Sequence, residues 1–157
     1  MRFCTRKLEL DAAHRVMRHE SKCKDLHGHR YVVEVTACAT KLDDLGRVID
    51  FGVIKSVFGG WLDKHLDHGT IANINDEALI EVCNREGWKL YTLPSNPTAE
   101  NIAEHLFTKG NELLMPYGVS VAAIRVYETP NCWADYSVNV EENQVMENDK
   151  NSASFEP

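Results

Sequence analysis

The sequence lacks any stretch of about 18 uncharged apolar residues, the length that a membrane-spanning helix needs. It also lacks an apolar run behind the basic residues near its start, so we expect no secretory signal peptide. Neither internal repeats nor low-complexity tracts occur before residue 140. The 157 residues, 43% hydrophobic and 26% charged, therefore predict one globular domain without a membrane partner.

Basic residues are outnumbered by acidic ones. The chain has 17 Lys and Arg against 24 Asp and Glu, which gives a formal net charge of −7. Proteins that grip a phosphate backbone usually carry a basic surface. Nucleic acid is therefore not an expected partner.

Cysteine is too scarce and too scattered for a disulfide scaffold. The five cysteines are an odd number and form no C-x-x-C pair, so neither a thioredoxin-like site nor a zinc ribbon is indicated. Their usage predicts a reducing, cytoplasmic compartment in which most thiols are buried.

Apolar periodicity predicts four or five strands and three helices. Strands are expected at 3–10, 30–40, 89–93, 119–128 and 133–140, and helices at 51–65, 75–86 and 98–114. Two strands, then helices, then two more strands form an α+β layout: an antiparallel sheet with helices packed on one face. The domain is expected to cover residues 1–140, and the polar, acidic tail 141–157 is expected to be disordered.

The most informative local motif runs from Cys23 to His29. In an extended segment, His27 and His29 project to the same side, at the start of the predicted strand 30–40. His14 ends the preceding strand, and antiparallel pairing can bring it opposite them. Three histidines without a fourth fixed ligand are the arrangement of a catalytic zinc site. Two alternatives remain open: surface or core histidines, or a closed structural site with Cys23 as fourth ligand.

Three further positions are candidates for catalysis or binding. Cys23 lies between Lys22 and Lys24, and cationic neighbours favour the thiolate that a base or nucleophile requires. Asp67 can fix the tautomer of the adjacent His68 if an irregular turn, allowed by Gly69, brings the two side chains together. Taken alone, an Asp-His dipeptide is too common to indicate a function.

Glu128 ends an alternating strand. A carboxylate in this position can bind an amidine-like pair of donors in a heterocycle through two parallel hydrogen bonds. Taken alone, a solvated glutamate at a strand end is the simpler interpretation.

Taken together and in this order, the motifs resemble the 6-pyruvoyl-tetrahydropterin synthase family over residues 3–140. They are Ala12-Ala13-His14-Arg15, Cys23-x₃-His27-Gly28-His29, Val48-Ile49-Asp50-Phe51, Leu66-Asp67-His68, Asn96-Pro97-Thr98-Ala99-Glu100-Asn101 and Tyr127-Glu128-Thr129. The resemblance implies a tunnelling fold (T-fold), in which subunits form a barrel as trimers that pair into hexamers, with active sites between subunits.

The resemblance also implies roles for individual residues. The metal is Zn²⁺, with ligands His14, His27 and His29. The catalytic residues are Cys23, Asp67, His68 and Glu128; Glu128 also anchors the pterin ring, with help from the Thr98 region of a neighbouring subunit. We expect no partner beyond the small pterin triphosphate substrate and further copies of the chain.

The spacing of Cys23 from His27 distinguishes two branches of the family. Three residues intervene here, as in carboxy-forming members, whereas pyruvoyl-forming members typically have five. The carboxy-forming branch is a zinc-dependent lyase of queuosine and 7-deazaguanine (preQ0) biosynthesis. It converts 7,8-dihydroneopterin triphosphate to 6-carboxy-5,6,7,8-tetrahydropterin, acetaldehyde and triphosphate.

Alternatives to this function are a pyruvoyl-forming synthase and a non-catalytic, zinc-binding T-fold protein. A cysteine hydrolase is disfavoured, because no oxyanion-hole motif accompanies Cys23. The sequence also departs from the family pattern after His68, where an extra residue precedes Asn73, and in the stretch 74–94, which is longer than in compact bacterial members.

Overall fold

The structure, a computed structural model, describes residues 1–138, so the predicted disordered tail 141–157 and the boundary at residue 140 lie outside the described residues. The strands are β1 (Arg2–His14), β2 (His27–Ala39), β3 (Gly69–Asn73), β4 (Leu90–Leu93), β5 (Ser120–Thr129) and β6 (Cys132–Ser137). The helices are α1 (Phe51–Ile54), α2 (Gly60–His65), α3 (Glu77–Glu86) and α4 (Ala99–Leu114), with short helical segments η1 (Lys22–Lys24), η2 (Lys55–Gly59) and η3 (Met115–Tyr117).

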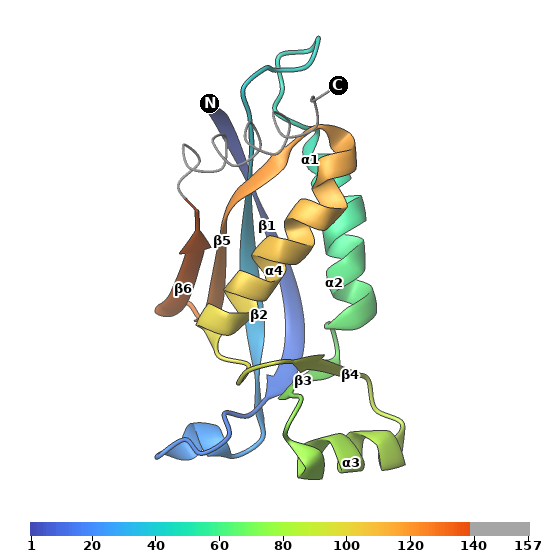
Figure 1. The fold of residues 1–157 in the computed structure, drawn as a ribbon, viewed down its shortest axis with the longest axis vertical. Coiled ribbons are helices and arrows are strands. Elements are labelled where there is room, and N and C mark those ends of the chain that lie inside the picture. The colour runs from blue at the N-terminus through green and yellow to red at the C-terminus, as the bar shows by residue number, and fades with distance from the viewer. Residues whose placement is uncertain (139–157) are drawn as a thin grey trace, which may run out of the picture.

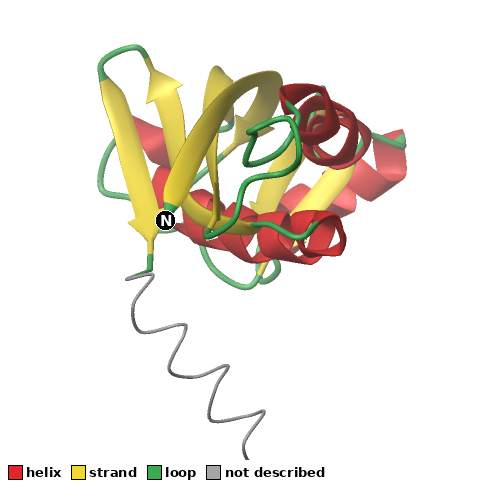
Figure 2. Cartoon of the chain, turned by 90° about the horizontal axis from the view of Figure 1, so that it is seen from above, coloured by secondary structure: helices red, strands yellow, loops and turns green. Residues whose placement is uncertain are grey.

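The six strands form one curled sheet in the order β4-β3-β1-β2-β5-β6, with the helices gathered on one side (Figures 1 and 2). β1, β2, β5 and β6 pair antiparallel, whereas β3 pairs parallel with both β1 and β4. The predicted α+β class with helices on one face is confirmed. The sheet, however, is mixed rather than wholly antiparallel, because the segment 69–73, for which no strand was predicted, pairs parallel to β1.

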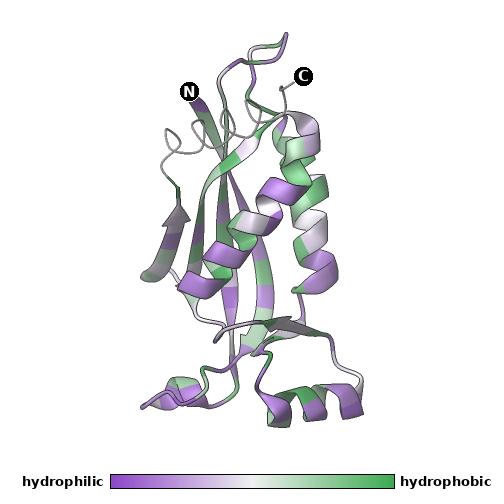
Figure 3. Ribbon diagram, viewed as in Figure 1, coloured by the Kyte–Doolittle hydropathy of each residue, from purple (hydrophilic) through white to green (hydrophobic). Residues whose placement is uncertain are grey.

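The helical layer forms where the sequence predicts it. Asp50 caps α1 through its carboxylate, which accepts a hydrogen bond from the Gly52 amide at 2.7 Å. The predicted helix 51–65 is one continuous run with a π-helical middle, η2, just before Gly60. Thr98 caps α4 by accepting a hydrogen bond from Asn101 N. Apolar residues of these helices face the sheet (Figure 3).

The main core lies between the helices and the long strands. Its largest fully buried apolar side chains come from strands and helices alike. They include Tyr31 of β2, Ile124 of β5, Ile54 of α1, Phe58 of η2 and Leu106 of α4. Burial of side chains of this size contributes roughly 1.5–3 kcal/mol each, which stabilises the sheet that carries the site. Within residues 1–138, no helix is long and apolar enough to cross a membrane.

The stretch 74–94 forms α3 and β4 at one end of the sheet, with α3 below the end of β1 in Figure 1. Asp76 caps α3 and Gly87 ends it in a left-handed conformation, at φ 68°. A small second core of Ala72, Leu79 and Cys83 joins α3 to β3. These residues extend the sheet by one parallel strand, β4, next to the end where β1 and β2 carry their histidines.

Candidate functional site

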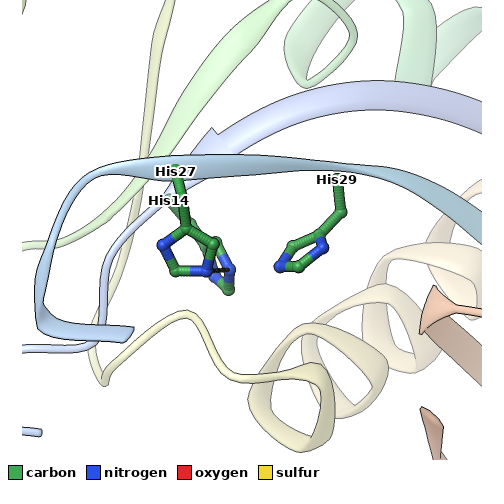
Figure 4. A group of neighbouring side chains, drawn as sticks. All are labelled: His14, His27 and His29. Carbon is green, nitrogen blue, oxygen red and sulfur yellow. Dashed lines mark hydrogen bonds between the residues drawn. The ribbon is translucent and has the colours of Figure 1, made fainter. Parts of the chain in front are cut away.

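Three histidines meet where β1 ends and β2 begins. His14 and His27 are paired residues of the antiparallel ladder, and His29 lies two residues further along β2 on the same face. Their imidazoles project to one side of the sheet, toward the segment that leads into α4 (Figure 4). One ring nitrogen from each lies within 4.8 Å of the others, so the cluster can bind a metal ion.

Backbone carbonyls orient two of the three rings. His14 Nδ1 lies 2.6 Å from the Pro97 carbonyl oxygen, and His27 Nδ1 lies 2.7 Å from the Asp25 carbonyl oxygen. Since a carbonyl oxygen only accepts, both Nδ1 atoms carry the proton and donate it. Both Nε2 atoms are consequently left with a free lone pair, which is the tautomer that a metal ligand needs.

The free nitrogens fit a metal. His14 Nε2 and His27 Nε2 lie 3.1 Å apart, and two lone pairs at that distance repel each other unless a cation lies between them. Two nitrogens on a tetrahedral zinc with bonds of ~2.0–2.1 Å would be about 3.3 Å apart. His29 Nε2 is buried and has no hydrogen-bond partner among the described residues, so the third ligand atom is also available.

Burial keeps His14 and His29 neutral. His14 is 1% exposed, and the loss of water lowers its pKa to about 4, against a smaller opposite effect of the hydrogen bond to Pro97. Burial also lowers the pKa of His29. Neutral imidazole is the form that binds a metal, so near pH 7 these two rings are in the binding form.

The metal-free protein is therefore expected to lose stability in mild acid because of His14. Unfolded histidine has a pKa of about 6.5, so between pH 6.5 and 4 the unfolded state binds more protons than the folded one. The contribution of neutral His14 to the free energy of unfolding is complete above pH 6.5. It is lost as the pH falls toward 4, and the loss is on the order of 3 kcal/mol. Urea denaturation of chelator-treated protein at several pH values measures it, with His14→Gln as the control. Equal pH dependence in both proteins would contradict the assignment.

Glu128 and Tyr31 border the same cluster. A Glu128 carboxylate oxygen lies 3.9 Å from His14 Nε2, but His14 is neutral near pH 7, so this contact is not an ion pair. The Tyr31 ring lies 5.7 Å from that of His14 and 5.4 Å from that of His29, and its buried hydroxyl has no hydrogen-bond partner within residues 1–138. Burial and the Glu128 charge raise the pKa of Tyr31. Tyr31 was expected only as a strand residue.

Cys23 lies in η1, in the loop that joins the two histidine-bearing strand ends. Its side chain is half-buried, and its carbonyl accepts a hydrogen bond from Val16 N at 2.8 Å. The cluster of potential metal ligands contains the three histidines and does not include Cys23. This arrangement favours the open three-histidine site over the closed site with a cysteine ligand.

Asp67 and His68 form a hydrogen-bonded pair. His68 Nδ1 lies 2.7 Å from Asp67 Oδ2, and His68 has a φ of 55°. The irregular turn that this pairing requires is therefore made by His68 itself, while Gly69 begins β3. Asp67 Oδ1 also accepts the amide of Asp11 at 2.8 Å, which fixes the pair against β1.

Among the described residues, no hydrogen bond joins this pair to the histidine cluster of the same chain. His68 lines a hollow of about 610 Å³ together with Asp11, Arg30 and Lys89, and His29 of the cluster also borders this hollow. Asp11 and Arg30 alternate with the histidines along β1 and β2, so their side chains face the other side of the sheet. His68 is 77% exposed there, so its ring is open to another molecule.

Thr98 lies close to the cluster of its own chain, because Pro97, whose carbonyl contacts His14, immediately precedes it. Its hydroxyl is used in capping α4. The Pro97 and Asp25 carbonyls, which orient the ligand rings, were not predicted. Both are backbone groups, and the Asn96-Pro97-Thr98 motif was the available signal for the first.

Comparison with known proteins agrees with the fold. A profile of the 6-pyruvoyl tetrahydropterin synthase family matches residues 3–139. The chain belongs to this family. A relative from Rickettsia conorii named 6-carboxy-5,6,7,8-tetrahydropterin synthase is 46% identical over 139 residues, covering 84% of this chain and 97% of the relative.

Two solved structures share the T-fold. One is an uncharacterized protein from Wolinella succinogenes, with a TM-score of 0.77, 22% identity and coverage of 88% of this chain and 98% of that one. The other is a Caenorhabditis elegans 6-pyruvoyl tetrahydropterin synthase, with a TM-score of 0.62, 23% identity and coverage of 87% and 95%. At these identities the likeness shows the fold alone.

Proposed function

We propose that this chain is a zinc-dependent carbon–carbon lyase that converts 7,8-dihydroneopterin triphosphate and water to 6-carboxy-5,6,7,8-tetrahydropterin, acetaldehyde and triphosphate. One observation carries the proposal: two unprotonated Nε2 atoms, of His14 and His27, face each other at 3.1 Å beside the unpartnered Nε2 of His29. The relative with 46% identity bears the name of this synthase. The proposal includes a cytoplasmic location and a role in queuosine and 7-deazaguanine biosynthesis.

Zinc bound by His14, His27 and His29 would supply Lewis-acid polarisation of the substrate's side-chain hydroxyls. The Pro97 and Asp25 carbonyls hold two of the ligand rings in the correct tautomer. Glu128 accepts hydrogen bonds from the amidine edge of the pterin, and its distance of 3.9 Å from His14 Nε2 supports a position beside the metal ligands. The pterin is thereby oriented for reaction, which is a positioning effect.

Proton transfer is assigned to Cys23 and His68. The Cys23 thiolate removes a proton from a side-chain carbon of the substrate, and His68 acts as the acid and base partner. Asp67 accepts a hydrogen bond from His68 Nδ1 at 2.7 Å, which leaves the His68 Nε2 free to exchange protons with substrate. Burial alone would raise the pKa of Asp67. Hydrogen bonds from Asp11 N and His68, with the nearby charge of Lys89, outweigh burial and keep this pKa below its usual value.

The proposed site needs two copies of the chain. His68 faces the side of the sheet opposite to the histidine cluster, so the Asp67–His68 pair of one subunit would act on substrate bound at the cluster of another. The barrel formed by trimers, and the hexamer formed from two of them, are proposed on this basis and on membership of the family.

The experiment is mass spectrometry of the products formed from 7,8-dihydroneopterin triphosphate by zinc-loaded and chelator-treated protein. We expect 6-carboxytetrahydropterin from the zinc-loaded protein, none after metal removal, and recovery when zinc is restored. A pyruvoyl product would assign the chain to the other branch of its family. If the substrate is unchanged at full zinc occupancy, the chain is a non-catalytic zinc-binding protein.

A further inference from the structure

One buried carboxylate near the site has no role in the chemistry described above. Asp76 is 2% exposed and caps α3 by accepting a hydrogen bond from Leu79 N. It also binds the Arg15 guanidinium at two points, with Arg15 Nε 2.6 Å from Oδ2 and Arg15 Nη2 in contact with Oδ1. Burying a carboxylate costs free energy unless it is paired and hydrogen-bonded. Because the Arg15 contact supplies this pairing at two points, each partner fixes the position of the other.

Arg15 begins the loop that carries Cys23. It directly follows the ligand His14, and the next two residues are also anchored. Val16 N donates to the Cys23 carbonyl at 2.8 Å, and the backbone of Met17 makes two hydrogen bonds, of 3.1 and 3.0 Å, with the Asn96 side chain. The loop 15–26, which we call the Cys23 loop, is therefore fixed at its first three residues.

The other end of this loop is also fixed, at the histidine cluster. The carbonyl of Asp25 holds the ring of His27 at 2.7 Å. Arg15 thus links the start of the Cys23 loop to the N-terminal end of α3 through Asp76.

We propose that Asp76, acting through Arg15, is a positioning residue for Cys23, so that α3 sets the location of the thiol relative to the histidine cluster. The stretch 74–94, which contains α3, thereby has a role in the reaction. The effect on turnover rests on the proposed lyase function, whereas the effect on the thiol does not.

The test is Asp76→Asn in the zinc-loaded enzyme. Asparagine keeps the shape and the capping ability of the side chain but removes the charge from the pair. The matched control is Asp135→Asn. Asp135 of β6 accepts two hydrogen bonds from the Arg125 guanidinium of β5, at 2.5 and 2.9 Å, so the substitution alters an exposed ion pair of the same kind. Three quantities are measured: zinc content, kcat and KM, and the rate at which iodoacetamide alkylates Cys23 relative to the exposed Cys132 of the same molecule.

For Asp76→Asn we expect normal zinc content and a kcat lowered by about 10- to 100-fold, with a much smaller change in KM, because a small displacement of a reacting group is this costly. The Cys23 to Cys132 alkylation ratio should change severalfold, and Asp135→Asn should match the wild type throughout. If Asp76→Asn does not fold, Arg15→Lys replaces it, since lysine keeps the charge but loses the two-point contact; it should show the same changes at smaller size.

A folded variant with wild-type kcat and wild-type alkylation ratio would overturn the proposal, even if its melting temperature falls, because the pair would then be structural only. If the wild-type enzyme itself makes no carboxy product, the proposed function fails. The alkylation ratio still decides the positioning role in that case, since alkylation requires no turnover.

Discussion

Replacing Cys23 with alanine is expected to lower kcat by about 10²- to 10⁴-fold, the range that a positioned proton-transfer group contributes, while the zinc content stays at one ion per chain. The thiol lies in the loop between the two histidine-bearing strand ends and is not one of the clustered potential ligands. Its loss should therefore remove chemistry and leave the metal. Product formation and metal analysis of the same preparation measure both effects.

The control for this experiment is Cys132→Ala, because Cys132 is an exposed thiol in β6. It should keep full activity and full zinc. If Cys23→Ala loses zinc along with activity, Cys23 is a metal ligand and the closed structural site is the correct description. If it keeps its activity, another group moves the proton.

Two inactive variants are expected to restore activity when they are combined in one assembly. Cys23→Ala removes the thiol at the histidine cluster, and His68→Ala removes the imidazole that faces the other side of the sheet. If each site takes Cys23 from one subunit and His68 from another, random mixing leaves about a quarter of the sites with both groups intact. Each variant alone should be nearly inactive.

Co-expression with two different affinity tags, followed by sequential purification, yields the mixed assemblies for an activity assay. Cys23→Ala mixed with itself under two tags is the control and should stay inactive. Mixed assemblies that form but show no recovery would mean that each site is complete within one chain, or that His68 takes no part in the reaction.

The cluster of three histidines was predictable because its geometry is local. An H-x-H pair at the start of a strand projects to one side, and a short antiparallel connection brings His14 opposite His27. The caps at Asp50 and Thr98 depend equally on nearby residues, and both are present.

The parts that sequence reasoning missed depend on distant contacts. β3 has five residues, too few for a clear alternation, and becomes a strand through parallel pairing with β1 and β4. Arg15 and Asp76 are 61 residues apart, and the Pro97 carbonyl lies 83 residues from His14. No local pattern predicts such pairs. The division of the site between two faces of the sheet likewise follows only from the fold.

The central claim, that the substrate's side chain is cleaved, is tested most directly by the ratio of acetaldehyde to triphosphate released by the zinc-loaded protein from 7,8-dihydroneopterin triphosphate. The carboxy-forming reaction releases both in equal amounts. We expect this one-to-one ratio throughout the time course. Triphosphate without acetaldehyde would contradict the claim, since the carbon–carbon bond would then be intact and the product would be of the pyruvoyl type.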